Sequence, residues 1–125
     1  MRSELSPDWD AIVIGSGLQV LMLERERVTR LRHDGLRVTA VEAFDRRTGE
    51  PRRFQAETVV LAAGALASSE LIVASGLEQL NPAGDLVATL RMGVDARTSA
   101  LDPTGRFRGL ENLYVIDASG TRGVD

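Results

Sequence analysis

A short apolar run followed at once by two glycines is the feature that most restricts how this chain can fold. Residues 11–14, Ala-Ile-Val-Ile, have the composition of a buried strand, and Gly15-Ser16-Gly17 follows it. Glycines after a strand suit an anion-binding turn, because backbone N–H groups can then approach a diphosphate without an intervening Cβ atom. The alternative is the tight turn of a hairpin, which also favours glycine.

The spacing after the glycines departs from that of a complete dinucleotide-binding unit. Position 20 is Val where the usual fingerprint has a third glycine, and Glu24 follows Gly15 by only nine residues. The acid that binds a ribose hydroxyl ordinarily lies about 20 residues further on. A parallel crossover needs at least about 10–12 residues, its helix included. On spacing alone, a hairpin turn and a phosphate-binding turn are about equally supported.

The segment after the glycines allows two structures. In one, residues 19–24 form a strand that pairs with residues 11–14 as a hairpin. In the other, a helix runs from Leu18 to His33, which the abundant Leu, Met, Glu and Arg permit, and its N-terminus would be an anion site. We expect the strand, because β-branched residues follow at Val28-Thr29.

The rest of the chain predicts an α/β fold with a small Rossmann-like sheet, a β-meander and one main helix. Alternating polar and apolar residues predict the meander over residues 28–55, with a type I′ turn at Asp34-Gly35. The expected sheet strands are residues 11–14, 19–24, 58–62 and 113–116. The expected helix is 65–75, with Gly76 at its C-terminal end, and Ser68 and Ser69 could lie on its exposed side. A loop is expected at 77–85, and Leu86–Met92 suggests a further short strand.

Composition limits the class of protein and its partners. A chain of 125 residues with 43% hydrophobic and 26% charged residues predicts one globular domain, residues 1–125. Its net charge of -3, with arginines interspersed among acids as on a solvated face, gives no reason to expect nucleic acid. Without cysteine, and with His33 beside a turn, no metal site is expected. No apolar run reaches the roughly 20 residues of a membrane span, so we expect a cytoplasmic protein.

Taken in order, five segments resemble the glucose–methanol–choline (GMC) family of FAD-dependent oxidoreductases. "DWDAIVIGSG" is similar to the family's first FAD strand and turn, and "VLMLERERV" to the strand whose Glu holds the adenosine ribose. The meander, "FQAETVVLAAGALASSELIVASG" and "ATLRMGVDARTSALDPTGRFRGLENLYVIDAS" resemble the family's later segments. The resemblance covers nearly the whole chain and implies FAD as cofactor and a small alcohol as substrate.

The resemblance also implies roles for particular residues. Gly15, Ser16 and Gly17 would contact the pyrophosphate, Glu24 the ribose, and the Val28 backbone the adenine. Ala62, Ala63 and Gly64 would line the path of the cofactor, with Asp117 and Ala118 near its flavin end. The exposed edges of so small a sheet would also favour a homodimer.

Departures from the family pattern concern catalysis. The family's catalytic His stands four residues before the Thr of "ATLRMG", and the corresponding residue is Asp85. A carboxylate with a pKa near 4 is a poor base for an alcohol unless burial raises that pKa. The second active-site residue, the substrate domain and the first Rossmann helix have no counterpart. The alternative to an FAD-binding domain is therefore a folded remnant, a pseudoenzyme without tight cofactor binding.

Overall fold

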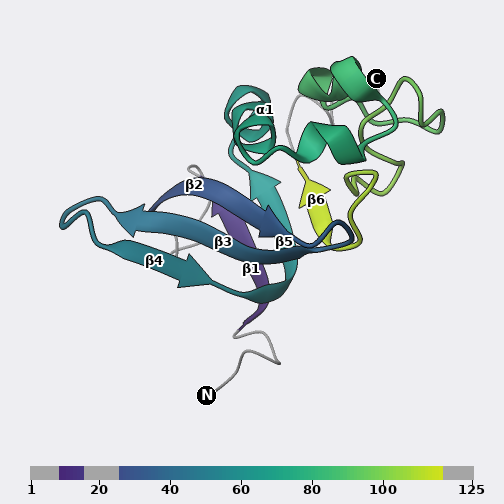
Figure 1. Ribbon diagram of the computed structural model, residues 1–125. Coiled ribbons are helices and arrows are strands. Elements are labelled where there is room, and N and C mark those ends of the chain that lie inside the picture. The colour runs from purple at the N-terminus through teal and green to yellow at the C-terminus, as the bar shows by residue number, and fades with distance from the viewer. Residues whose placement is uncertain (1–8, 16–25, 117–125) are drawn as a thin grey trace.

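The computed structural model describes residues 9–15 and 26–116, and over these residues the chain has the expected α/β fold (Figure 1). A parallel sheet contains β1 (Trp9–Gly15), β5 (Ala56–Ala62) and β6 (Leu113–Val115), in the order β1-β5-β6. An antiparallel sheet contains β2 (Glu26–His33), β3 (Val38–Asp45) and β4 (Pro51–Phe54). The helical elements are α1 (Ala65–Ala74) and two 3₁₀ helices, η1 (Leu77–Leu80) and η2 (Gly84–Thr89).

The parallel sheet confirms three of the predicted strands, 11–14, 58–62 and 113–116. β5 is its central strand, where the run Thr-Val-Val-Leu-Ala suits a strand with neighbours on both sides. Ile12, Val59 and Leu113 are almost completely buried and belong to one hydrophobic core. The fourth predicted strand, 19–24, lies outside the described residues.

The second sheet confirms the predicted meander. Leu31 of β2 pairs with Val41 of β3, which pairs with Phe54 of β4, so this row of side chains faces the core. The alternative helix from Leu18 to His33 is wrong over residues 26–33. β2 is extended there, because pairing with β3 lets it bury Leu31 completely.

The turn between β2 and β3 differs from the predicted type I′ turn. That turn needs positive φ at both central residues, but only Gly35, with φ 93°, is in this region. Instead, the Asp34 carboxylate accepts hydrogen bonds from the Leu36 and Arg37 N–H groups, both at 2.9 Å. The Asp34 N–H also donates to the Arg37 carbonyl at 3.1 Å, so side-chain and backbone bonds together hold a longer, four-residue connection.

Helix α1 begins and ends close to its predicted limits. Gly76 follows it with φ 72°, as expected for a glycine after a helix C-terminus. The Leu31 N–H donates to Ser75 Oγ at 2.8 Å, which fastens the end of α1 to β2. Ser68 and Ser69 are buried and not exposed as the sequence allowed, because they lie with Ile72 on the side of α1 that packs against other elements, among them η1, η2 and β2.

The segment after α1 contains the clearest error of the sequence prediction. The expected strand over Leu86–Met92 is wrong: Gly84–Thr89 form η2, and Met92 makes only an isolated bridge to Leu101. Val87 and Leu90 lie three residues apart and are both buried, a spacing that a 3₁₀ turn places on one face. The expected loop likewise contains η1, which buries Leu77.

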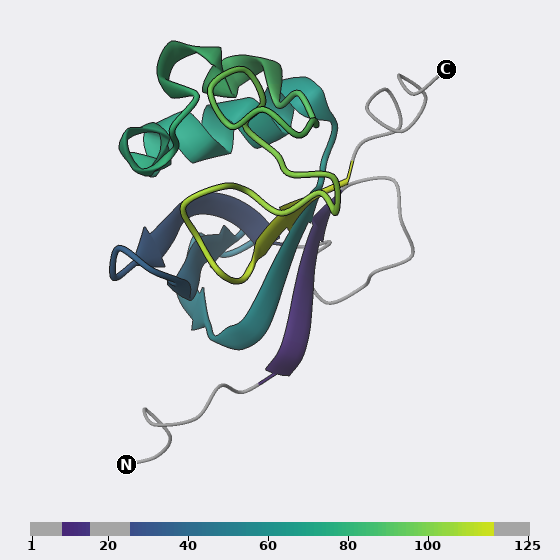
Figure 2. The same ribbon diagram turned by 90° about the vertical axis from the view of Figure 1, so that its right-hand side faces the viewer.

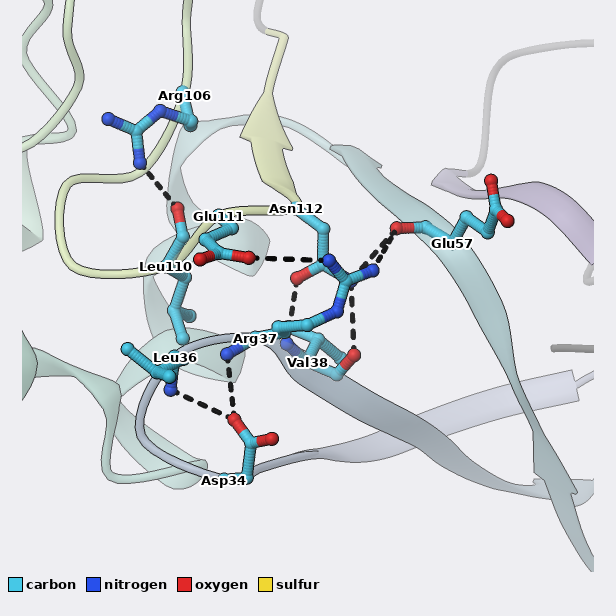
Figure 3. A network of polar contacts seen from close by, with 9 residues as sticks. All are labelled: Asp34, Leu36, Arg37, Val38, Glu57, Arg106, Leu110, Glu111 and Asn112. Carbon is cyan, nitrogen blue, oxygen red and sulfur yellow. Dashed lines mark hydrogen bonds and ion pairs between the residues drawn. The ribbon is translucent and has the colours of Figure 1, made fainter. Parts of the chain in front are cut away.

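Polar contacts join the two sheets beside the β2–β3 turn (Figure 3). Asn112 is buried, and its amide Nδ2 donates to the carbonyl oxygens of Val38 and Glu57 at 3.1 and 3.0 Å. Arg37 donates to the Glu57 carbonyl at 3.1 Å and forms an ion pair with Glu111 at 3.4 Å. These bonds fix the start of the meander's second strand against β5.

The described elements cover one face of the parallel sheet. Figure 2 shows the meander, α1 and the segment after it on the same side of β1, β5 and β6. On the other face, Val13, Val60 and Tyr114 form a row across the three strands and are only half-buried. Among the helices that the structure describes, none is long and apolar enough to span a membrane.

Candidate functional site

The candidate site lies at the carboxyl edge of the parallel sheet. Gly15 ends β1, Ala62 ends β5, and the two residues are paired in the parallel register. In open α/β sheets, ligands bind outside the carboxyl ends of the strands, where the loops converge. The fold thus brings together two of the predicted site residues, Gly15 and Ala62, from positions 47 residues apart.

Gly15 is a residue that the sheet itself requires. A Cβ atom at this position would lie 2.9 Å from the Ala62 carbonyl oxygen, closer than such atoms are found in proteins. The close approach arises from the neighbouring strand's backbone, which cannot move away without breaking the parallel ladder. Glycine at position 15 therefore lets β1 and β5 approach each other closely at the carboxyl edge.

The connection from β5 into α1 has the same character. Gly64 precedes the helix with φ 94° and ψ 157°, a conformation essentially restricted to glycine. No side chain caps the helix, and its first turn contains no acidic residue. The N-terminus of α1, ten residues long, therefore carries its partial positive charge at the carboxyl edge with no acidic residue in the helix's own first turn.

Ionised carboxylates with unusual pKa values lie in turns. Hydrogen bonds from the backbone of Leu36 and Arg37 lower the pKa of Asp34, and the backbone N–H of Arg97 does the same for Asp95. Burial on its own would raise the pKa of Asp102, but hydrogen bonds from Thr104 and Arg106 outweigh it and lower that pKa. These groups hold loops in place and are not members of the carboxyl edge.

The other predicted site residues have different positions. Ala63 and Gly64 link β5 to α1, next to Ala62. Val28 lies in β2, an edge strand of the other sheet, where it pairs with Ala43 and packs against the core. Ser16, Gly17, Glu24, Asp117 and Ala118 lie outside the described residues. Asp85, the residue at the family's base position, lies in η2, which packs against α1.

Sequence reasoning missed the burial of Ser68 in the first half of α1. Its hydroxyl oxygen is buried and, among the described residues, has no hydrogen-bond partner. Two adjacent serines in a helix give no sign of which side chain faces inward, because both have similar helix propensity and polarity. The neighbouring Ser69 hydroxyl donates to the Leu66 carbonyl at 3.0 Å, so the two serines differ in hydrogen bonding although both are buried.

Comparison with known proteins gives a family for the chain. A family model described as GMC oxidoreductase matches residues 8–121, and therefore covers both sheets, α1 and the segment up to β6. A search of curated proteins found no match to the chain. The matched range is most of the 125 residues. The chain therefore belongs to the GMC oxidoreductase family.

Proposed function

We propose that this chain is an FAD-binding domain of the GMC type that binds the cofactor through its diphosphate at the carboxyl edge of the parallel sheet. The observation that carries the proposal is the pairing of Gly15 with Ala62 at the carboxyl edge, where the connection from β5 leads directly into the N-terminus of α1. The uncapped N-terminus of α1 beside it has no acidic residue in its first turn. Such an edge suits a dianionic group.

Each proposed contact follows from the chemistry of the residue. Gly15, Ser16 and Gly17 would bind the pyrophosphate through backbone N–H groups, and Glu24 would accept hydrogen bonds from the ribose hydroxyls. The backbone of Val28 would bind the adenine, and Ala62, Ala63 and Gly64 would leave space for the cofactor. Asp117 and Ala118, which follow β6 in the sequence, would lie near the flavin end.

The proposal concerns binding and does not include turnover. FAD, when bound, supplies a two-electron acceptor for alcohol oxidation. A base is also needed to take the alcohol proton, and Asp85 stands where the family has a His. Because an aspartate ordinarily has a pKa near 4, it is nearly always ionised at neutral pH and is a weak base. We assign no catalytic residue.

The test is an FAD titration that separates charge at the site from folding. Leu66 lies in the first turn of α1 and is 72% exposed, so a polar side chain fits there. Leu66→Glu should preserve or strengthen the helix, because an acid near the N-terminus is favourable, but it should repel a diphosphate. We expect FAD affinity, measured by flavin fluorescence and absorbance near 450 nm, to fall about tenfold, the effect of roughly 1.4 kcal/mol.

Leu66→Gln is the matched control, because it changes shape and polarity without adding charge, and it should leave FAD affinity within about twofold of the parent chain. If saturating FAD changes neither the flavin spectrum nor the unfolding temperature of the parent chain, the alternative holds. The chain is then a folded remnant without tight cofactor binding. Equal losses in both variants would place the diphosphate elsewhere.

A further inference from the structure

The meander gathers arginines on the face turned away from the core. Paired residues of neighbouring strands project to the same side, so the register defines this face. One row is Arg27, Phe44 and Pro51, and the next is Arg30, Glu42 and Arg53. Arg32, paired with Ala40, extends the face along β2. We call this surface, made by Arg27, Arg30, Arg32 and Arg53 with Phe44 and Pro51, the arginine face.

The charge of the meander differs in sign from that of the whole chain. Residues 26–54 contain eight arginines and five acidic residues, a formal charge of +3, whereas the chain has a charge of -3. The remaining residues therefore carry a formal charge of -6. In the sequence these arginines alternate with acids and are typical of a solvated surface. The fold separates them, because strand pairing places four of them on one side of one sheet.

Glu42 is the carboxylate of the arginine face, and it is already paired. Its Oε2 lies 3.1 Å from Arg32 Nε and 3.8 Å from Arg53 Nη2. Arg27 and Arg30 are exposed, and neither forms an ion pair with another residue in the described ranges. Four guanidinium groups thus face one carboxylate, and the excess of positive charge points to solvent.

A groove in the arginine face provides apolar contact as well as charge. Its volume is about 600 Å³, and it shares Glu42, Phe44, Pro51 and Arg53 with the arginine face. The rest of its lining is Thr29, Ala43, Gly49 and Arg52. Phe44 is half-buried, so one side of its ring and the Pro51 ring can contact a ligand. The volume lies within the range of small-ligand sites. A ligand for this groove should combine negative charge with at least one apolar group.

We propose that the arginine face binds a short acidic peptide segment of a partner protein, with carboxylates on the arginines and an apolar side chain in the groove. Guanidinium groups match carboxylates through paired hydrogen bonds. From Arg27 to Arg32 the strand extends about 16 Å, which equals about five residues of an extended peptide. A long polyanion is disfavoured because it would also approach the remaining residues, whose formal charge of -6 would repel it. The inference does not rest on FAD binding, and the peptide is titrated without FAD because Arg27 and Arg30 flank Val28, whose backbone is the proposed adenine contact.

The test measures the anisotropy of a fluorescein-labelled octapeptide that contains six glutamates around two central leucines. We expect binding at low salt that weakens at least fivefold between 50 and 200 mM NaCl, because exposed charge pairs are screened, whereas the same peptide with glutamine in place of glutamate should not bind. Arg30→Gln with Arg53→Gln should lower the affinity about tenfold, as expected for two lost exposed charge pairs. Glu42→Gln should raise it, because it removes the negative charge of this face.

The matched control is Arg91→Gln with Arg97→Gln, which removes two exposed arginines elsewhere and changes the net charge equally. It should change the affinity less than about twofold. Circular dichroism of both double variants verifies that the fold is retained. The proposal is overturned by an equal loss in the control, by no binding at 1 mM peptide in 20 mM NaCl, or by tighter binding of a single-stranded DNA octamer. Self-association through the arginine face, seen as a dimer lost in Arg30→Gln with Arg53→Gln, would equally overturn it in favour of a second copy of this chain.

Discussion

The side chain of Asn112 binds both backbone polar groups of Val38, and so imitates one step of strand pairing between the two sheets. The Val38 N–H donates to Asn112 Oδ1 at 2.7 Å, and Asn112 Nδ2 donates to the Val38 carbonyl at 3.1 Å (Figure 3). The same Nδ2 also donates to the Glu57 carbonyl of β5. One buried amide therefore satisfies three main-chain groups where the meander meets the parallel sheet, next to the start of β6.

Asn112→Ala should destabilise the chain by about 2–3 kcal/mol. The substitution removes the partner of the Val38 N–H and carbonyl groups, whereas the Glu57 carbonyl keeps its hydrogen bond from Arg37. Each unsatisfied group costs about 1–3 kcal/mol unless water replaces the amide. Urea unfolding followed by circular dichroism measures the change. Glu111→Gln, at an exposed ion pair with Arg37, is the control and should cost less than about 1 kcal/mol. A loss below about 0.5 kcal/mol for Asn112→Ala would mean that water takes over these bonds.

Local patterns predicted the strands and α1 because each depends on residues close together in the sequence. The apolar run 58–62 and the alternation across the meander determine which strands form, and Gly76 marks the end of the helix. η2 was missed because the spacing of Val87 and Leu90 indicates a helical turn only once it is known that both side chains are buried. The turn at Asp34 was assigned the wrong type because its carboxylate competes with the backbone for the same N–H groups.

The candidate site was predictable in composition and not in geometry. Glycine after an apolar strand pointed to Gly15, but its close approach to the Ala62 carbonyl depends on a parallel register between distant segments. The arginine face could not be predicted for the same reason. Arg30 and Arg53 become neighbours of Glu42 only through two strand pairings, and a bulge between Val28 and Arg30 shifts the first of them.

Gly15→Ala should destabilise the chain by about 1–3 kcal/mol, the usual cost of inserting a group into a packed site. The added Cβ would lie 2.9 Å from the Ala62 carbonyl oxygen, so β1 or β5 must shift. Thermal unfolding without FAD isolates this effect from ligand binding. Adding Ala62→Gly should not restore stability, because the clash is with the backbone oxygen and not with the Ala62 side chain. Recovery in the double variant would contradict the close backbone approach.

Ser68→Ala should leave stability unchanged or raise it by about 0.5–1 kcal/mol. The hydroxyl is buried without a partner in the described part of the chain, and alanine removes that cost while improving helix propensity. Ser69→Ala is the matched control in the next position, because it removes a hydrogen bond to the Leu66 carbonyl. Ser68→Ala should therefore be the more stable of the two by urea unfolding. A loss above about 1 kcal/mol would show that the Ser68 hydroxyl is bonded.

Asp102 should make the chain less stable in acid. Burial opposes ionisation of its carboxyl group, but the Thr104 hydroxyl at 2.6 Å, the N–H groups of Thr104 and Arg106, and the Arg106 guanidinium lower its pKa. A lowered pKa in the folded state contributes stability above the unfolded value near 3.9, and this contribution is lost as the pH falls through the folded pKa. Asp102→Asn should therefore be less stable at pH 7 and show a smaller fall in unfolding free energy between pH 5 and pH 2. Thr104→Val removes one donor and should raise the pKa of Asp102, measured by the ¹³C shift of its carboxyl group. An unchanged pKa in Thr104→Val would mean that the backbone N–H groups and the Arg106 guanidinium are enough to hold the carboxylate in its ionised form.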